Sequence, residues 1–255
     1  MRLRFGDWGV EVDARLLSRT AERCTLAPFE SPEAPVHLSV RVGGVPAGEG
    51  GPLDPRRPAG PRFALQGDTV LVEPPADALD TELALRVALQ LATLRQGGLL
   101  LHAGGVAFGT AGVVALGPSG AGKSTFTRLC AGAGAKVLSD EVIALYPDGH
   151  VEGSPFCSDL DLPSALPRAR LAALLLLEKG DAERLALVPA REALAALAGQ
   201  VFRPLLGEVT PADVLQRLSA LLERTAARKL TFRKDPAVAG FVEEWVHAAA
   251  EATLH

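Results

Sequence analysis

The chain contains little cysteine. Cys24, Cys130 and Cys157 are the only three among 255 residues, and they lie far apart in the sequence. An odd and widely spaced set offers neither a disulfide framework nor the paired spacing of a zinc site. This usage is typical of a reducing compartment, and we therefore expect a cytoplasmic protein.

Long apolar segments are also missing. The longest uninterrupted apolar run, residues 171–177, is too short to cross a bilayer. The first seven residues lack the apolar core of a secretory signal. These two observations predict a protein that does not partner a membrane.

An excess of basic residues is absent as well. Lys and Arg number 26 against 30 Asp and Glu, which gives a net charge of −4 and leaves no basic stripe for nucleic acid. The length suits one large domain, or one domain with a small appendage, and a hydrophobic fraction of 48% is enough to fill a core. Nucleic acid is therefore not an expected partner.

One glycine-rich segment carries a specific chemical signal. Residues 117–124 read Gly-Pro-Ser-Gly-Ala-Gly-Lys-Ser and match G-x-x-x-x-G-K-[ST] at every fixed position. Residues 113–116 before it predict a buried strand, and the residues from Thr125 onward predict a helix. In that context backbone amides and a helix N-terminus surround phosphate oxygens, while Lys123 reaches the β- and γ-phosphates and Ser124 ligates Mg²⁺. The residues expected to bind the nucleotide are Gly117, Pro118, Ser119, Gly120, Ala121, Gly122, Lys123, Ser124 and Thr125.

The sequence before residue 77 predicts a separate region rich in β-structure. Residues 43–61 hold many Gly and Pro residues and predict an exposed loop, because proline is excluded from helix interiors and central strands. We expect a β-rich region at 1–76 and a catalytic domain at 77–255. The strands expected in the first region are 2–5, 10–12, 36–42, 62–65 and 69–73.

The second region predicts alternating helices and strands. A helix capped by Asp77 or Asp80 is expected to run to about residue 96, with its apolar residues on one face. A long strand at 99–108 and a strand at 113–116 are expected to flank a turn at 109–112. Further strands are expected at 136–138, 142–146, 171–177, 185–188 and 229–232, and further helices at 125–131, 190–198, 211–224 and 236–250.

A histidine precedes the glycine-rich loop on the expected hairpin. If Phe108 pairs with Val113, a one-for-one count places His102 opposite Ser119, beside the loop. There it can contact a phosphate or help to position an acceptor. The alternative interpretation is a core histidine that bonds to the backbone.

Two acidic residues, Asp140 and Glu141, follow the strand expected after the loop and its helix. Ligands of open α/β sheets bind at such strand ends. Phosphoryl transfer uses one carboxylate near the metal and often another that orients or deprotonates the acceptor hydroxyl. Because neighbouring residues of a strand point to opposite sides, both reach one site only if the chain bends there. The alternative is a solvated strand end.

Residues 99–106, 117–124 and 137–141 together resemble the C-terminal catalytic domain of HPr kinase/phosphorylase. They resemble more closely the HPr-kinase-like proteins of peptide-modification clusters, including lasso-peptide kinases. The resemblance implies an α/β fold of the phosphoenolpyruvate carboxykinase/HPr kinase type, a mixed sheet flanked by helices, here with a β-rich N-terminal extension. It also implies ATP- and Mg²⁺-dependent phosphorylation of a serine hydroxyl, with His102 at the phosphates, Asp140 as the base and Glu141 at the metal. The chain departs from that family in having Glu141 where a second Asp is usual, and in lacking a Glu-x-Arg-Gly loop.

The sequence leaves three functional hypotheses open. In the first, a kinase transfers phosphate to a hydroxyl of a small protein, peptide or metabolite, and Arg203 helps to neutralise the transferred group. In the second, an ATPase or GTPase uses Glu178, which follows the apolar residues 174–177, as a Walker-B-like acid. The third is a nucleotide-binding module without catalysis.

ATP, GTP and pyrophosphate remain open as the phosphate donor, although the Asn-Lys-x-Asp of a guanine site is absent. We expect the N-terminal extension to recognise the acceptor or to form the subunit contact of a homo-oligomer.

Overall fold

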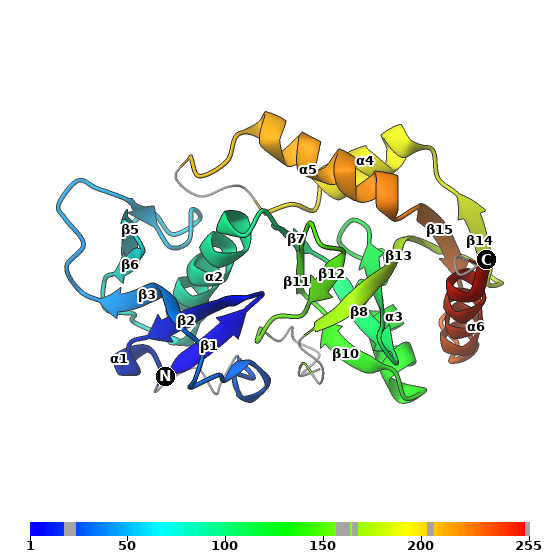
Figure 1. Cartoon of the computed structure of the whole chain (residues 1–255), viewed down its shortest axis with the longest axis horizontal. Helices are drawn as coiled ribbons and strands as arrows, with labels where there is room; N and C mark the ends of the chain where they lie inside the picture. Colours follow the sequence, from blue (N-terminus) through cyan, green and yellow to red (C-terminus); the bar gives the residue numbers. More distant parts are fainter. Residues whose placement is uncertain (18–23, 157–163, 165–167, 203–206, 253–255) are drawn as a thin grey trace. The chain divides into compact units, whose positions relative to one another are not determined.

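The computed structural model describes residues 1–17, 24–156, 164, 168–202 and 207–252. These residues form a mixed α/β protein with two compact units (Figure 1). One unit comprises Met1–Gln96 with Pro204–Val209, and the other comprises Gly97–Arg203 with Thr210–His255. Within the described part of the chain, none of the helices combines the length and the apolar character needed to cross a membrane.

The first unit is built on a mixed sheet. Its strand order is β1-β2-β3-β6-β5-β4, in which β3 runs parallel to β2 and β6, and the remaining pairs are antiparallel. The strands expected in this region are therefore present in the structure. The sheet also contains one short additional edge strand, β4. The elements are β1 (Arg2–Phe5), β2 (Trp8–Val12), α1 (Ala14–Leu17), η2 (Ala27–Phe29), β3 (Val36–Val42), β4 (Gly51–Pro52), β5 (Arg62–Gln66), β6 (Thr69–Val72) and α2 (Ala78–Arg95).

The helix α2 belongs to this first unit. Asp77 is its N-cap, and the Asp77 side chain accepts a hydrogen bond from the Asp80 backbone N at 2.8 Å. The helix packs against β1, β2, β3 and β6. The first unit therefore extends to Gln96, past the boundary expected at residue 76, because the apolar residues of α2 pack on the N-terminal sheet. The buried residues of α2 lie on nearly all sides of the helix, whereas the sequence pattern predicted a single apolar face.

The Gly/Pro-rich segment 43–61 is anchored to the same unit. Gly51 and Pro52 pair with β5 at the edge of the sheet. Proline, which has no backbone N–H to donate, is tolerated there because one side of an edge strand forms no hydrogen bonds to another strand. Arg57 forms an ion pair with the buried carboxylate of Asp80 at 3.0 Å. This segment is therefore joined to both the sheet and α2.

The second unit contains a mixed sheet in which β13 is the long central strand. The strands are β7 (Leu99–His102), β8 (Gly104–Phe108), β9 (Ala111–Leu116), β10 (Lys136–Ser139), β11 (Val142–Leu145), β12 (His150–Glu152), β13 (Arg168–Lys179), β14 (Arg184–Leu187) and β15 (Ala227–Phe232). The order is β10-β8-β9-β13-β12-β11-β7, and β15 pairs with both β13 and β14. Because β9, β13 and β15 are mutually parallel, their carboxyl ends meet at one edge.

Helices cover this sheet unevenly. The helices are α3 (Lys123–Gly132), α4 (Ala190–Ala198), α5 (Pro211–Arg224) and α6 (Ala237–Ala252). α3 packs against α6 and against β8, β9 and β10, while α4 and α5 pack against each other (Figure 1). Alternate side chains of β9 and β13, such as Ala115 and Leu175, share a buried cluster with Phe126 of α3 and Val242 of α6. This packing places the beginning of α3 at the carboxyl end of β9.

Candidate phosphate-binding site

The loop 117–122 joins β9 directly to α3 and relies on glycine backbone conformations. Gly117 has φ 152°, and Gly122, which precedes the helix, has φ 106°. Both values lie in the region that favours glycine. A Cβ on Gly117 would also lie 2.7 Å from the Cβ of Ala121, and one on Gly122 would lie 3.2 Å from the Phe232 ring. The glycines at these two fixed positions of the motif are thus required by the loop's own geometry.

Lys123 is the first residue of α3, and its side chain folds back over the loop. It is 7% exposed, and its Nζ donates to the carbonyl oxygens of Gly117 at 2.9 Å and Pro118 at 3.4 Å. Burial lowers the pKa of this amine, because a charged group loses favourable hydration there. A bound anion would provide the counter-charge that two neutral carbonyls do not.

Asp140 and Glu141 lie at a corner of the chain between β10 and β11. β10 pairs with β8, while β11 pairs with β7, so the chain changes partner strands at this point. The Ser139 hydroxyl accepts hydrogen bonds from the backbone N of Glu141 at 3.2 Å and of Val142 at 3.1 Å, which holds the corner. Asp140 is 2% exposed, and Glu141 is half-buried. The chain therefore has the bend that two adjacent carboxylates need in order to approach one site.

A matching break separates β7 from β8 at Ala103. The Ala103 backbone N donates to the Glu141 carbonyl oxygen at 3.1 Å, which joins the two corners. Because β10 and β9 are both antiparallel to β8, their carboxyl ends lie at the same edge. Two strand spacings, about 10 Å, separate them. The corner and the loop 117–122 are therefore neighbours across β8.

Gly104 begins β8 and makes room for α3. A Cβ at this position would lie 2.7 Å from Thr127 Oγ1 and 3.6 Å from Lys123 Cβ. The first turn of α3 thus sits directly against the strand that runs between the loop and the Asp140 corner. The sequence contains this signal as paired glycines after His102, although we predicted no packing role for them.

The predicted hairpin register was wrong. Phe108 pairs with Ala111 across a two-residue turn, and Val106, not Phe108, pairs with Val113. In addition, His102 lies on β7 and pairs with Val142, so it is not opposite Ser119. The sequence of residues 99–108, in which His102 is the only polar side chain, did not indicate a break at Ala103, because the pairing of the neighbouring strands causes it. His102 is nevertheless exposed and is therefore not a core histidine.

Gln200 links His102 to the loop, and sequence analysis did not identify it. The residues around Val201 lie antiparallel to β7, with the His102 backbone N donating to the Gln200 carbonyl oxygen at 2.8 Å. With the Gln200 side-chain amide turned so that its nitrogen faces two further carbonyl oxygens, this nitrogen donates to His102 at 2.9 Å and to Gly117 at 3.2 Å. Gly117 thereby accepts from both Gln200 and Lys123. No motif predicts this tether, because Gln200 lies far from the loop in sequence.

We expect Gln200→Leu to lower the free energy of unfolding by about 1–2 kcal/mol, because two carbonyl groups lose a donor. ATP affinity should also fall, since the first residue of the loop loses a constraint. Urea unfolding and ATP titration measure the two effects. The exposed residue Gln216 provides the control, and Gln216→Leu should change stability by less than about 0.5 kcal/mol. Equal behaviour of the two variants would remove the proposed role of the tether.

Another predicted residue, Glu178, stands apart from this arrangement. Glu178 is exposed at the end of β13, where it accepts a hydrogen bond from Thr231 Oγ1 at 3.0 Å. Leu175 and Leu177 face α3 and α6, so strand alternation directs Glu178 to the opposite face of the sheet. Arg203 lies outside the described residues.

Comparisons with known proteins add little to this description of the site. Neither the known protein-family models nor the curated proteins contain a match to the chain. Among solved structures, it is similar to the HPr(Ser) kinase/phosphatase from Coxiella burnetii, with a TM-score of 0.31 and 13% identity over 61% of this chain and 99% of that chain. This is a distant structural relationship.

Proposed function

We propose that the second unit binds ATP with Mg²⁺ through residues 117–125 and transfers the γ-phosphoryl group to a hydroxyl of a small protein, peptide or metabolite. The observation that carries the proposal is the shared sheet edge. It brings a buried carboxylate, Asp140, within about two strand spacings of a loop that matches the phosphate-binding pattern. Phosphoryl transfer needs this combination of phosphate anchor and acceptor-side carboxylate.

The residues at the loop suit a phosphate chain. Lys123 is desolvated, and its hydrogen-bond partners among the described residues are carbonyl oxygens. A polyphosphate would therefore gain an ammonium group already held at the start of α3, together with the helix N-terminus. This is a physical reason, independent of the motif, for a polyanion to occupy the loop.

The same residues suit a phosphate-bound Mg²⁺. No group of three or more His, Cys, Asp or Glu in the described part of the chain could hold a metal by itself. Mg²⁺ at nucleotide phosphates needs only one or two protein oxygens, because phosphate and water complete its shell. Ser124 and Glu141 would be those ligands. The bound metal would neutralise charge that develops on the transferred phosphoryl group.

In the proposed reaction, Asp140 accepts the proton of the acceptor hydroxyl. The hydroxyl oxygen forms a bond to the γ-phosphorus as the bond to the β–γ bridging oxygen breaks, which releases ADP. Lys123 and the backbone amides of the loop hold the phosphates, and His102, whose backbone N bonds to Gln200, is the proposed assisting residue at the phosphates. Arg203 is the proposed second cation at the transferred group. Burial of Asp140 excludes water that would otherwise compete for it.

Incubation of the purified protein with γ-labelled ATP and Mg²⁺ tests the proposal. Candidate acceptors are peptides and small proteins encoded beside its gene, and free phosphate is resolved from labelled acceptor. Label on an acceptor is the expected result. Free phosphate alone, released at a rate that no candidate acceptor changes, would replace the kinase proposal with hydrolysis and direct attention to Glu178.

The lowered pKa of Lys123 predicts a pH dependence of ATP affinity. Nucleotide phosphates favour the protonated amine, so ATP affinity should fall as pH rises through the Lys123 pKa. Because burial lowers that pKa, the fall should begin below the ordinary lysine value of about 10.4. Calorimetric titrations over the alkaline range where the protein stays folded measure it. Lys123→Ala should bind weakly with a flat profile, and a parallel decline in both proteins would assign the pH effect to another group.

A further inference from the structure

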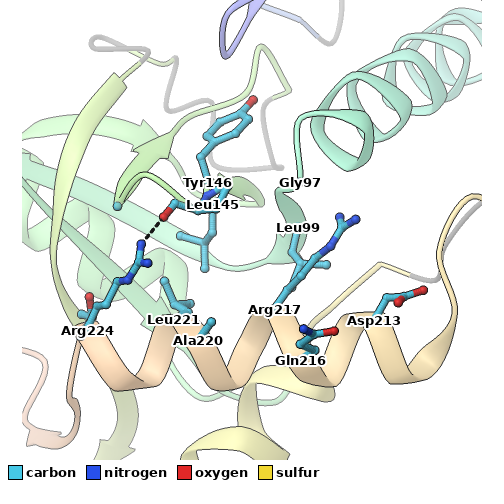
Figure 2. A pocket seen from close by; sticks show the side chains of 13 residues that line it. Gly97, Leu99, Leu145, Tyr146, Asp213, Gln216, Arg217, Ala220, Leu221 and Arg224 are labelled. Atoms are coloured by element: carbon cyan, nitrogen blue, oxygen red, sulfur yellow. Dashed lines mark hydrogen bonds between the residues drawn. The ribbon is translucent and has the colours of Figure 1, made fainter.

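A cavity lies in the second unit, between α5 and one end of the β7–β11 pair. Figure 2 shows residues that line it. Its volume is about 430 Å³, a size typical of small-molecule sites. Leu99 and Leu145, which are paired partners on β7 and β11, form part of its wall. Ala220 and Leu221 of α5 also line it. The cavity is thus bounded by aliphatic side chains from both a sheet and a helix.

Two arginines of α5 line the same cavity. Arg217 and Arg224 are seven residues apart, so they lie on one face of the helix with Leu221 between them (Figure 2). Arg217 Nη1 donates to the Gly98 carbonyl oxygen at 2.9 Å, and Arg224 Nη1 donates to the Pro147 carbonyl oxygen at 2.6 Å. Both guanidinium groups are thereby held in place at the cavity before any ligand arrives, which lowers the entropic cost of binding.

The one acidic residue among those that line the cavity, Asp213, is bonded chiefly to Thr210 in the cap of α5, and its charge also interacts with Arg217. Asp213 Oδ2 accepts hydrogen bonds from the backbone N of Thr210 at 2.8 Å and from Thr210 Oγ1 at 2.7 Å, in the capping box of α5. Its charge therefore supports the helix N-terminus. With two arginines against this one carboxylate, the cavity carries a net positive charge.

We infer that this cavity binds a small organic anion with an apolar body, such as an aryl or alkyl carboxylate or sulfonate. The apolar body lies against Leu99, Leu145 and Leu221, and the anionic group meets Arg217 and Arg224. Guanidinium groups suit carboxylates and sulfonates because their planar N–H donors match paired oxygens. An aliphatic wall alone would select an uncharged ligand, and two arginines alone would select a compact anion.

The inferred site is separate from the phosphate-binding loop. Leu99 begins β7 at the cavity and His102 ends the strand beside the loop, which separates the two by roughly 10 Å of extended chain. The inference therefore does not rest on the proposed kinase function, and either can fail without the other.

Titration with anilinonaphthalene sulfonate, a fluorescent organic anion with an apolar body, tests the inference. The double variant Arg217→Gln, Arg224→Gln should bind the dye at least about tenfold more weakly, because two charged donors are lost. Arg228→Gln is the matched control, since Arg228 also donates to a backbone carbonyl but does not line the cavity. N-phenylnaphthylamine, the uncharged analogue, should bind wild type at least about tenfold more weakly than the sulfonate.

Two further variants fix the location of the dye. Ala220→Phe fills the cavity from an exposed helix position without removing charge and should also abolish binding. Lys123→Ala should leave dye binding unchanged. Equal affinity for the charged and uncharged dyes would overturn the inference, as would an equal loss with Arg228→Gln or retained binding in Ala220→Phe. Loss of dye binding in Lys123→Ala would locate the dye at the phosphate loop, and this result would also overturn the inference.

Discussion

Replacement of Asp140 by asparagine should lower the rate of label transfer to an acceptor by roughly 10²–10⁴-fold, the usual contribution of a general base. The amide keeps the shape of a side chain that is 2% exposed, but it cannot accept the hydroxyl proton. The rate constant from a single-turnover experiment with γ-labelled ATP measures the effect. ATP affinity should change far less, because in the proposed site the loop and Lys123, rather than Asp140, bind the phosphates.

Glu178→Gln provides the comparison for this experiment. Glu178 is exposed and directed to the sheet face opposite α3, so its neutral analogue should retain near wild-type transfer. The reverse pattern, full transfer in Asp140→Asn and loss in Glu178→Gln, would contradict the assignment of the base. Circular dichroism of both variants would establish that neither result reflects unfolding.

A large loss of stability is expected from Gly153→Ala. A Cβ at residue 153 would lie 1.9 Å from the Leu138 carbonyl oxygen, which is a backbone atom that cannot rotate away. Either the chain near Ser154 or the end of β10 must move, and we expect a loss of more than about 3 kcal/mol in the free energy of unfolding. The Ser139–Ser154 hydroxyl contact of 3.2 Å would be disturbed with it.

The displacement would also reach the reaction, because Leu138 precedes the Asp140 corner by two residues. We therefore expect slower phosphoryl transfer in any folded fraction of Gly153→Ala. Gly240→Ala is the matched control. This glycine lies inside α6, and a Cβ added to it would meet no neighbouring element within 4 Å, so alanine should raise stability by about 0.5–1 kcal/mol. Urea unfolding measures both. Equal stability of the two variants would contradict the close packing of residues 138 and 153.

Local sequence patterns predicted the elements on both sides of the glycine-rich loop. The expected strand at 113–116 lies within β9, and the expected helix at 125–131 lies within α3. Both depend on short-range properties: a buried apolar strand, glycines that adopt left-handed backbone conformations, and a helix that starts at Lys123. Such features are read within about ten residues, so they need no knowledge of the rest of the chain.

Predictions that depended on contacts between residues far apart in the sequence were less successful. The largely apolar segment 99–108 predicted one strand, but β7 and β8 pair with different strands and separate at Ala103. The apolar residues of α2 predicted a helix correctly, yet they did not reveal that the helix packs on the N-terminal sheet. An apolar segment specifies that it will be buried, and the same pattern is satisfied by many different partners.

The sequence by itself determined the strand, the loop and the helix that make the candidate phosphate site, because those conformations follow from residues next to one another. Only the tertiary structure decided which side chains share that site. It placed the Asp140 corner across β8 from the loop 117–122, brought Gln200 beside Gly117 and turned Glu178 away. It also brought Arg217 and Arg224 to one cavity with Leu99 of β7 and Leu145 of β11. Strand pairing and helix packing bring together residues from separate parts of the chain, and no local pattern encodes that choice of partner.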